Sequence, residues 1–191
     1  PSWGNEDYWI VKIDSIGVKE WDKRFGGNDI DELSSMQNTT DGGFILGGTS
    51  YSGISGDKTH PTWGGFDYWI VKIDSLGNKK WDNDFGANNI EALISLNKTN
   101  DDGYLLSGYS QSGISGDKSE NNLGLKQTWI VKSDSVGNKQ WEKTIFTTGV
   151  DEISFTVQSS TQCYISVNYT NGGTGGYKTM PNWDTTNTTH D

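Results

Sequence analysis

The chain has 191 residues, a formal net charge of −10 and only 31% hydrophobic residues, with 25 glycines and 9 tryptophans. The negative charge argues against a nucleic-acid or anionic-membrane partner, because both require basic patches, and no apolar run reaches the roughly 18 residues needed to span a bilayer. The single cysteine, Cys163, excludes an internal disulfide and a cysteine-based metal cluster. Few aliphatic side chains, many large rings and many turn residues predict an all-β fold.

The first predicted element is a β-hairpin. An aromatic and β-branched run from Tyr8 to Asp14 leads into the turn Ser15-Ile16-Gly17, and the chain returns through Trp21 to Phe25. The aspartate and the glycine of this turn indicate a structural role, because an Asp side chain accepts turn N–H groups and Gly supplies a positive φ.

A second hairpin is predicted directly after the first. It runs from about Ile30 to Asn38, turns at residues 39–43 and returns along residues 44–48. A polar connector, Ser52–Lys58, follows and recurs intact as Ser112–Lys118. Four short strands and one long loop therefore make up each unit.

The unit repeats with a fixed spacing of 60 residues. The run from Asp7 to Ser15 recurs from Asp67 to Ser75 and, weakened, from Thr128 to Ser135. All nine tryptophans fall into three phases of this spacing, namely Trp9/Trp69/Trp129, Trp21/Trp81/Trp141 and Trp3/Trp63/Trp183. The chain is thus one repeat array over 1–191, with units 1–60, 61–120 and 121–180 and the start of a fourth at 181–191.

The size of the unit favours a four-stranded blade, and the array favours a partial β-propeller. A β-solenoid is the alternative, although its rungs usually repeat at about 20–30 residues. The string Tyr-Trp-Ile-Val-Lys-Ile-Asp-Ser-x-Gly-x-Lys-x-Trp, with the later Thr-x-Asp-Gly-Gly-Phe, resembles the repeat of large secreted β-propeller proteins of Bacteroidota. Its Ile-Asp-Ser-x-Gly-x-x-x-Trp core is also similar to pyrroloquinoline-quinone-type blades and to the Asp-box. This resemblance implies type IX secretion and an extracellular or cell-surface location.

The third copy departs from the pattern. Cys163, Asn168 and Tyr177 stand where the second copy has Gly103, Gly108 and Asp117. The fourth copy either carries an insertion or has drifted, since the fixed spacing puts Thr188-Thr189 at the Tyr-Trp position. Three units and a stub are fewer than the roughly four to eight blades of a closed propeller. We therefore expect a fragment of a longer array or, alternatively, several chains that assemble into one ring.

The tryptophans suggest two roles. Trp9, Trp21 and their copies lie in predicted strands, where we expect them to fill the space between neighbouring blades. Trp3, Trp63 and Trp183 lie in loop sequence and are candidate ligand-binding residues, because an exposed ring can stack on a sugar. The alternative for these three is a loop anchored by tucking its Trp onto the blade, which Leu123 at the equivalent position of copy three favours.

The predicted turn tips are also candidate modification sites. Ser15, Ser75 and Ser135 each follow an Asp and precede an aliphatic residue. This order resembles the O-glycosylation pattern of exported Bacteroidota proteins, and an exposed turn carries a bulky glycan without disturbing a core.

Neither a metal site nor a catalytic site is predicted. Asn28, Asp29, Asp31 and Glu32 gather oxygen atoms, so calcium is a weak alternative to an exposed acidic loop. The two histidines fall in different repeat phases, and no Ser/His/Asp constellation or phosphate loop occurs.

We therefore expect a noncatalytic adhesion, scaffold or interaction module without a cofactor. Its expected partners are cell-surface proteins or glycans and other blades of the same or another chain. The alternatives are a lectin-like propeller and a fragment of a propeller enzyme.

Overall fold

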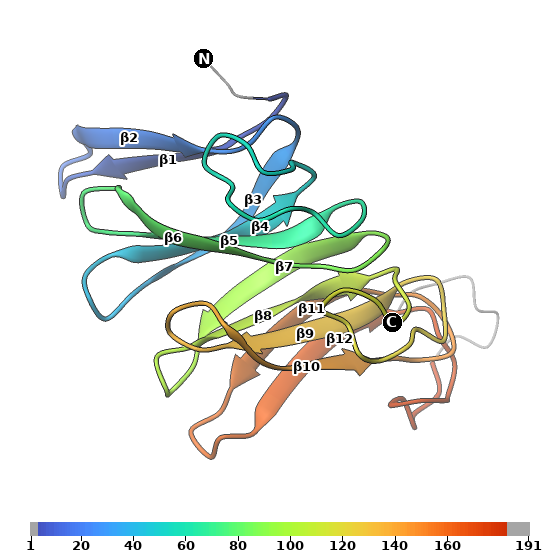
Figure 1. The fold of residues 1–191 in the computed structure, drawn as a ribbon. Coiled ribbons are helices and arrows are strands. Elements are labelled where there is room, and N and C mark those ends of the chain that lie inside the picture. The colour runs from blue at the N-terminus through green and yellow to red at the C-terminus, as the bar shows by residue number, and fades with distance from the viewer. Residues whose placement is uncertain (1–3, 183–191) are drawn as a thin grey trace.

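The computed structural model describes residues 4–182, which form antiparallel β-sheets and contain no helix, so none of them forms a membrane-spanning helix. The all-β prediction is confirmed, and both predicted hairpins are present in each of the three copies (Figure 1). The strands are β1 (Tyr8–Ile13), β2 (Lys19–Phe25), β3 (Asp31–Asn38), β4 (Phe44–Ser50), β5 (Asp67–Ile73), β6 (Lys79–Phe85), β7 (Glu91–Lys98), β8 (Tyr104–Ser110), β9 (Gln127–Ser133), β10 (Lys139–Ile145), β11 (Asp151–Gln158) and β12 (Tyr164–Thr170).

The four strands of one sequence unit do not form one sheet. The two complete sheets have the orders β3-β4-β5-β6 and β7-β8-β9-β10, so each joins the second hairpin of one copy to the first hairpin of the next. Two hairpins remain as separate two-stranded sheets, which we call the N-terminal half-sheet (β1-β2) and the C-terminal half-sheet (β11-β12). No sheet closes into a barrel or ring within the described residues.

All hairpin turns lie at one end of the sheets, and the links between hairpins lie at the opposite end (Figure 1). This arrangement follows from the antiparallel order, because each hairpin leaves and returns on the same side. The long connectors, residues 51–66 and 111–126, therefore gather at the end away from the turn tips.

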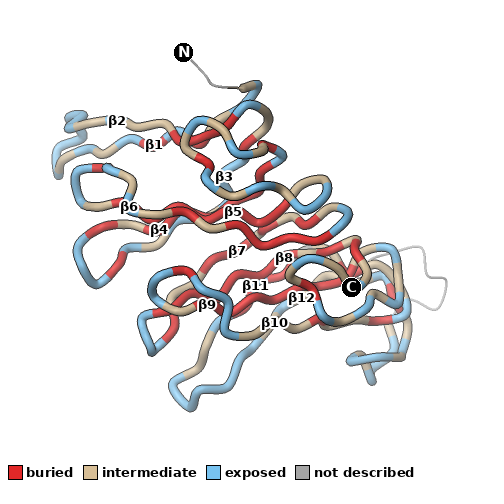
Figure 2. The backbone as a smooth tube through the Cα atoms, viewed as in Figure 1, coloured by how far each residue is buried: buried red, intermediate tan, exposed pale blue. Residues whose placement is uncertain are grey.

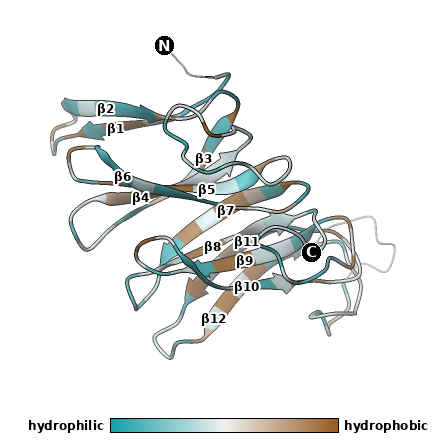
Figure 3. Ribbon diagram, in the orientation of Figure 1, coloured by the Kyte–Doolittle hydropathy of each residue, from teal (hydrophilic) through white to brown (hydrophobic). Residues whose placement is uncertain are grey.

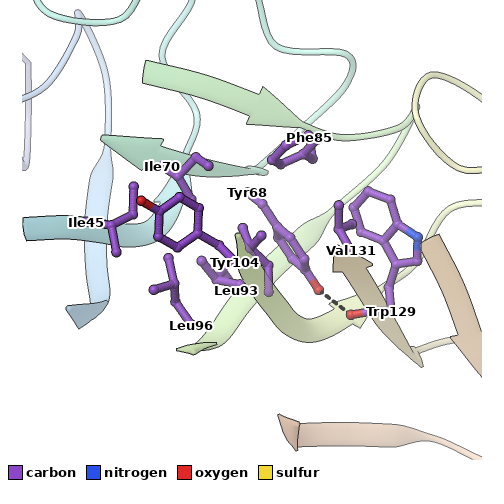
Figure 4. Close-up of a cluster of buried hydrophobic side chains, with 10 residues drawn as sticks. Ile45, Tyr68, Ile70, Phe85, Leu93, Leu96, Tyr104, Trp129 and Val131 are labelled. Atoms are coloured by element: carbon purple, nitrogen blue, oxygen red, sulfur yellow. Dashed lines mark hydrogen bonds between the residues drawn. The ribbon is translucent and has the colours of Figure 1, made fainter. Parts of the chain in front are cut away.

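The sheets stack face to face, and alternate residues of the central strands point toward opposite neighbours. In β5, Trp69 and Val71 pack toward the N-terminal half-sheet, whereas Tyr68 and Ile70 pack toward β7-β10. The whole of β5 is consequently buried, as Figure 2 shows. Figure 4 shows the core between the two complete sheets, which includes Ile45, Tyr68, Ile70, Phe85, Leu93, Leu96, Tyr104, Trp129 and Val131.

The expectation that strand tryptophans fill the space between sheets is confirmed for Trp69 and Trp129, which are fully buried. Trp81 is half-buried and packs against the core, with its ring centroid 6.2 Å from that of Tyr104 in the next sheet. The expectation is wrong for Trp9, which is 67% exposed. Its side of the N-terminal half-sheet faces away from the stack, so no described sheet covers it.

Candidate binding site

The aspartate turns adopt the predicted geometry. In the β5-β6 turn, Asp74 Oδ1 accepts hydrogen bonds from the backbone N–H groups of Leu76 and Asn78 at 3.0 and 2.9 Å. These bonds hold the pKa of Asp74 well below its usual value, and the bond from the Asn78 N–H has the largest effect. Gly77 follows with φ +78°. The turns at Asp14 and Asp134 have the same bonds, so these carboxylates shape the backbone.

The candidate glycosylation residues Ser15, Ser75 and Ser135 occupy these turns, and all three are exposed. They lie at the end of the sheets opposite the long connectors (Figure 1). The structure therefore places the three serines on exposed turns, at the opposite end of the sheets from the connector that carries Trp63.

Of the three loop tryptophans, only Trp63 lies within the described residues; Trp3 and Trp183 lie outside them. Trp63 is in the connector between β4 and β5 and is 57% exposed. Its backbone N–H donates to Asp67 Oδ2 at 2.6 Å, and one side of the ring approaches Gly116 of the next connector. Trp63 is thus partly anchored and partly available to a ligand.

The acidic stretch at residues 28–32 holds a connector in place. Asp31 is buried and accepts hydrogen bonds from the Gly27 N–H at 2.7 Å and the Ser52 hydroxyl at 3.0 Å. Ser52 Oγ in turn accepts the Asp29 N–H at 2.9 Å. No cluster of three metal-ligating side chains is found within residues 4–182.

A buried charged cluster at the ends of β5, β6 and β7 is a feature that the sequence analysis missed. Lys58 from the connector forms a buried ion pair with Asp84, and Asp67 and Glu91 lie beside this pair. Burial raises the pKa of Asp67 to about 6 and also raises that of Asp84. No repeated signal marks this cluster in the sequence, because the Lys–Asp pair at a 26-residue spacing does not recur: Thr144 follows Lys118 at the same spacing.

The cluster is not repeated in the next copy. Gln127 and Thr144 stand at the positions of Asp67 and Asp84, and Lys118 donates to the Thr144 hydroxyl instead. Gln127 Nε2 donates to the Thr147 carbonyl at 3.0 Å. In this copy the uncharged side chains of Gln127 and Thr144 therefore take the place of the two aspartates in holding the connector against the sheet.

A cavity of about 350 Å³ opens at the C-terminal half-sheet. It is lined by Thr128 and Ile145 of the last complete sheet, by Ser166 and Asn168 of β12, and by Tyr177 of the following loop. In the interior of the stack, the positions equivalent to Thr128, Ile145 and Ser166 are Tyr68, Phe85 and Leu106, which belong to the core that buries Trp129. The cavity therefore corresponds to the place between the two complete sheets where the Trp129 indole is buried.

Both ends of the stack carry exposed apolar side chains. On the N-terminal half-sheet these are Trp9, Val11 and Ile13, which alternate along β1 and so share one face. On the C-terminal half-sheet the exposed residues lie opposite one another in pairs, Phe155 with Val167 and Val157 with Ile165. Figure 3 shows the hydrophobic colouring along β12.

The chain was compared with known proteins. No protein-family model matches it, and no curated protein is significantly similar to it.

Proposed function

We propose that the chain is a noncatalytic segment of a β-propeller that acts as an adhesion, scaffold or interaction module outside the cell or on its surface. The observation that carries this proposal is the stack of four-stranded antiparallel sheets at a fixed 60-residue spacing. Propellers are built from four-stranded antiparallel sheets repeated around a central axis, so sheets of this size are the units that a propeller requires. The extracellular location rests on the sequence resemblance to secreted Bacteroidota propellers.

The use of the carboxylates supports a binding role over a catalytic one. Asp31, Asp74 and Asp151 each accept backbone N–H groups that fix a turn or a strand end. Equivalent carboxylates do the same in the neighbouring copies, Glu91 among them, whereas a propeller enzyme breaks its symmetry to build one central site. The connectors at one end of the sheets form the surface that we assign to a partner.

A binding array of glycans and extracellular proteins tests this function. We expect saturable binding of a cell-surface component without its chemical conversion, and replacement of connector residues should weaken that binding. Turnover of a bound glycan or alcohol, with or without added pyrroloquinoline quinone, would overturn the noncatalytic assignment.

A lectin-like function is the second candidate, and the exposure of Trp63 favours it. A largely exposed indole in a polar connector suits the apolar face of a sugar. Glycan binding should be lost in Trp63→Ala and retained in Leu123→Ala, the matched control from the equivalent exposed position in copy three. Equal binding by both variants would argue against a glycan site at Trp63.

We also propose that Ser15, Ser75 and Ser135 carry O-glycans. Their exposure on the turn tips supports this proposal. Intact-mass analysis of protein from a Bacteroidota host should show added sugar that decreases stepwise in single Ser→Ala variants, and an unmodified mass would dismiss the proposal.

A further inference from the structure

The two half-sheets are complementary halves of the same four-stranded sheet. In the complete sheets, a hairpin of the β11-β12 type pairs through its second strand with the first strand of a hairpin of the β1-β2 type, as β8 pairs with β9. Within residues 4–182, β12 pairs only with β11, and β1 pairs only with β2. Each half-sheet therefore presents one edge that the interior sheets use for pairing.

We propose that the C-terminal half-sheet of one copy of this chain binds the N-terminal half-sheet of a second copy, with Trp9 of the second copy inserted into the C-terminal cavity. The interior sheets fix the expected register, because Gly48 lies opposite Trp69 and Gly108 lies opposite Trp129. The same spacing places Asn168 opposite Trp9 of the second copy. This inference rests on the proposed propeller architecture and adds the partner to it.

The cavity and the exposed indole match in position and in size. Trp129 packs against Tyr68 with a centroid separation of 5.0 Å, and Thr128 stands at the Tyr68 position on the cavity wall. Because Thr128 and Ser166 are smaller than their equivalents Tyr68 and Leu106, the cavity of about 350 Å³ has room for an indole. Asp22 already accepts the Trp9 Nε1–H at 3.3 Å, just as Asp82 accepts that of Trp69 at 3.0 Å.

The same association covers the other exposed apolar side chains. Ile45, at the position equivalent to Ile165, packs in one core with Leu93 and Leu96 of the next sheet. The equivalents of these leucines are Leu33 and Met36, which are exposed on β3. One junction thus covers the outer face of β12 in the first copy and the exposed part of β3 in the second.

Two junctions of this kind would close a pair of copies. Residues 4–182 supply two complete sheets and two half-sheets, so two copies of this part joined at both junctions would contain six four-stranded sheets. Six lies within the roughly four to eight blades of propellers, whereas three copies would give nine. Two identical junctions related by a two-fold axis also satisfy the symmetry of common homo-oligomers.

One charge contact limits the strength of this junction. Lys58 pairs with Asp84 in the first complete sheet, and the residues at the same positions across the junction are Lys178 and Arg24 of the second copy. Arg24 is ion-paired with Asp7 at 3.3 Å, and Lys178 would add a second cation at this place, which opposes association. Arg24→Asp restores the Lys–Asp combination of the interior sheet and should therefore tighten the pair.

Sedimentation velocity of the whole chain over a wide concentration range tests the proposal. We expect a reversible dimer of twice the 21.1 kDa chain mass. Trp9→Ala should raise its dissociation constant by at least about tenfold, Arg24→Asp should lower it, and Ile16→Ala, an exposed control on the turn tip, should leave it unchanged. Circular dichroism checks that each variant is folded.

Two results would overturn the proposal. One is a monomer at every concentration in both the original chain and Arg24→Asp; the other is a dimer whose dissociation constant does not respond to Trp9→Ala. Neither result would touch the proposed binding function, because ligand binding by a monomer is measured separately on the array.

Discussion

The hydroxyl of Tyr68 donates a 3.0 Å hydrogen bond to the backbone carbonyl of Trp129, 61 residues further along the chain and in the neighbouring sheet. Tyr8 makes the equivalent bond to Trp69 at 3.1 Å. A glycine makes room for each hydroxyl, since a Cβ on Gly108 would lie 2.9 Å from the Tyr68 oxygen. In the third copy the tyrosine and the glycine are both replaced. Thr128 stands at the Tyr68 position and Asn168 at the Gly108 position, and the Thr128 hydroxyl donates to Asn168 Oδ1 at 2.8 Å.

Tyr68→Phe should lower the free energy of unfolding by about 1 kcal/mol, because it leaves the buried Trp129 carbonyl without this donor. Urea denaturation followed by circular dichroism measures the change. Tyr51→Phe is the matched control, since Tyr51 is exposed and its substitution should have no measurable effect. Equal stability of both variants would show that the bond between sheets contributes nothing.

Trp69→Ala should lower the free energy of unfolding by about 3–5 kcal/mol, the usual cost of emptying a large aromatic site in a core. Trp9→Ala should cost less than about 1 kcal/mol at concentrations where the chain is monomeric, because solvent already covers most of that ring. Thermal and urea unfolding of the two variants give this comparison. A large effect at Trp9 in the monomer would mean that its ring is buried in solution.

Asp67 should make the stability depend on pH. Its folded pKa of about 6 exceeds the unfolded value of about 3.9, so the folded chain binds more protons between these values and this group's contribution falls as pH rises. Asp67→Asn removes that dependence. As the pH rises from 4 to 7, the free energy of unfolding of the variant should therefore increase by on the order of 2 kcal/mol relative to that of the original chain.

Urea denaturation at several pH values between 4 and 7 checks this expectation. Asp102→Asn, at an exposed turn position where asparagine also tolerates the observed φ of 60°, is the control and should show no comparable change. If the free energies of unfolding of Asp67→Asn and the original chain differ by the same amount at every pH, the pKa of Asp67 is not raised in the folded chain.

Gly17→Ala should destabilise the chain by about 1 kcal/mol, because Gly17 has φ +86° and a Cβ there is strained even though nothing lies within 4 Å of it. Gly53→Ala is the matched control, with the same open space and no positive φ. Thermal unfolding should separate the two variants. Identical midpoints would mean that the turn relaxes to accommodate alanine.

The sequence predicted the strands and turns well because local chemistry dictates them. Asp14 and Gly17 specify their turn without help from distant residues. It did not predict which hairpins share a sheet, because that depends on pairing across a long connector, and the repeated polar sequence of the connector does not indicate which strands pair. The exposure of Trp9 and the burial of Trp69 were likewise unpredictable, because identical local strings differ only in whether another sheet covers them.

The buried cluster and the cavity could not be anticipated for a related reason. Asp67 and Asp84 are ordinary surface residue types, and only the return of the connector through Lys58 buries them. The cavity arises from residues in two different sheets, Thr128 of β9 and Ser166 of β12, and neither residue type signals a cavity by itself. Only a comparison of equivalent positions between the copies points to the buried cluster and to the cavity.

The half-unit offset between sequence copy and sheet has a consequence for how such a gene can change length. Removal or duplication of any 60-residue segment within the array, wherever the cut falls, replaces each strand by one of the same type. Each central strand of a four-stranded sheet then still has a partner on both sides. Slippage between the similar first two copies would therefore change the number of sheets in whole steps, and no strand would be left without a partner.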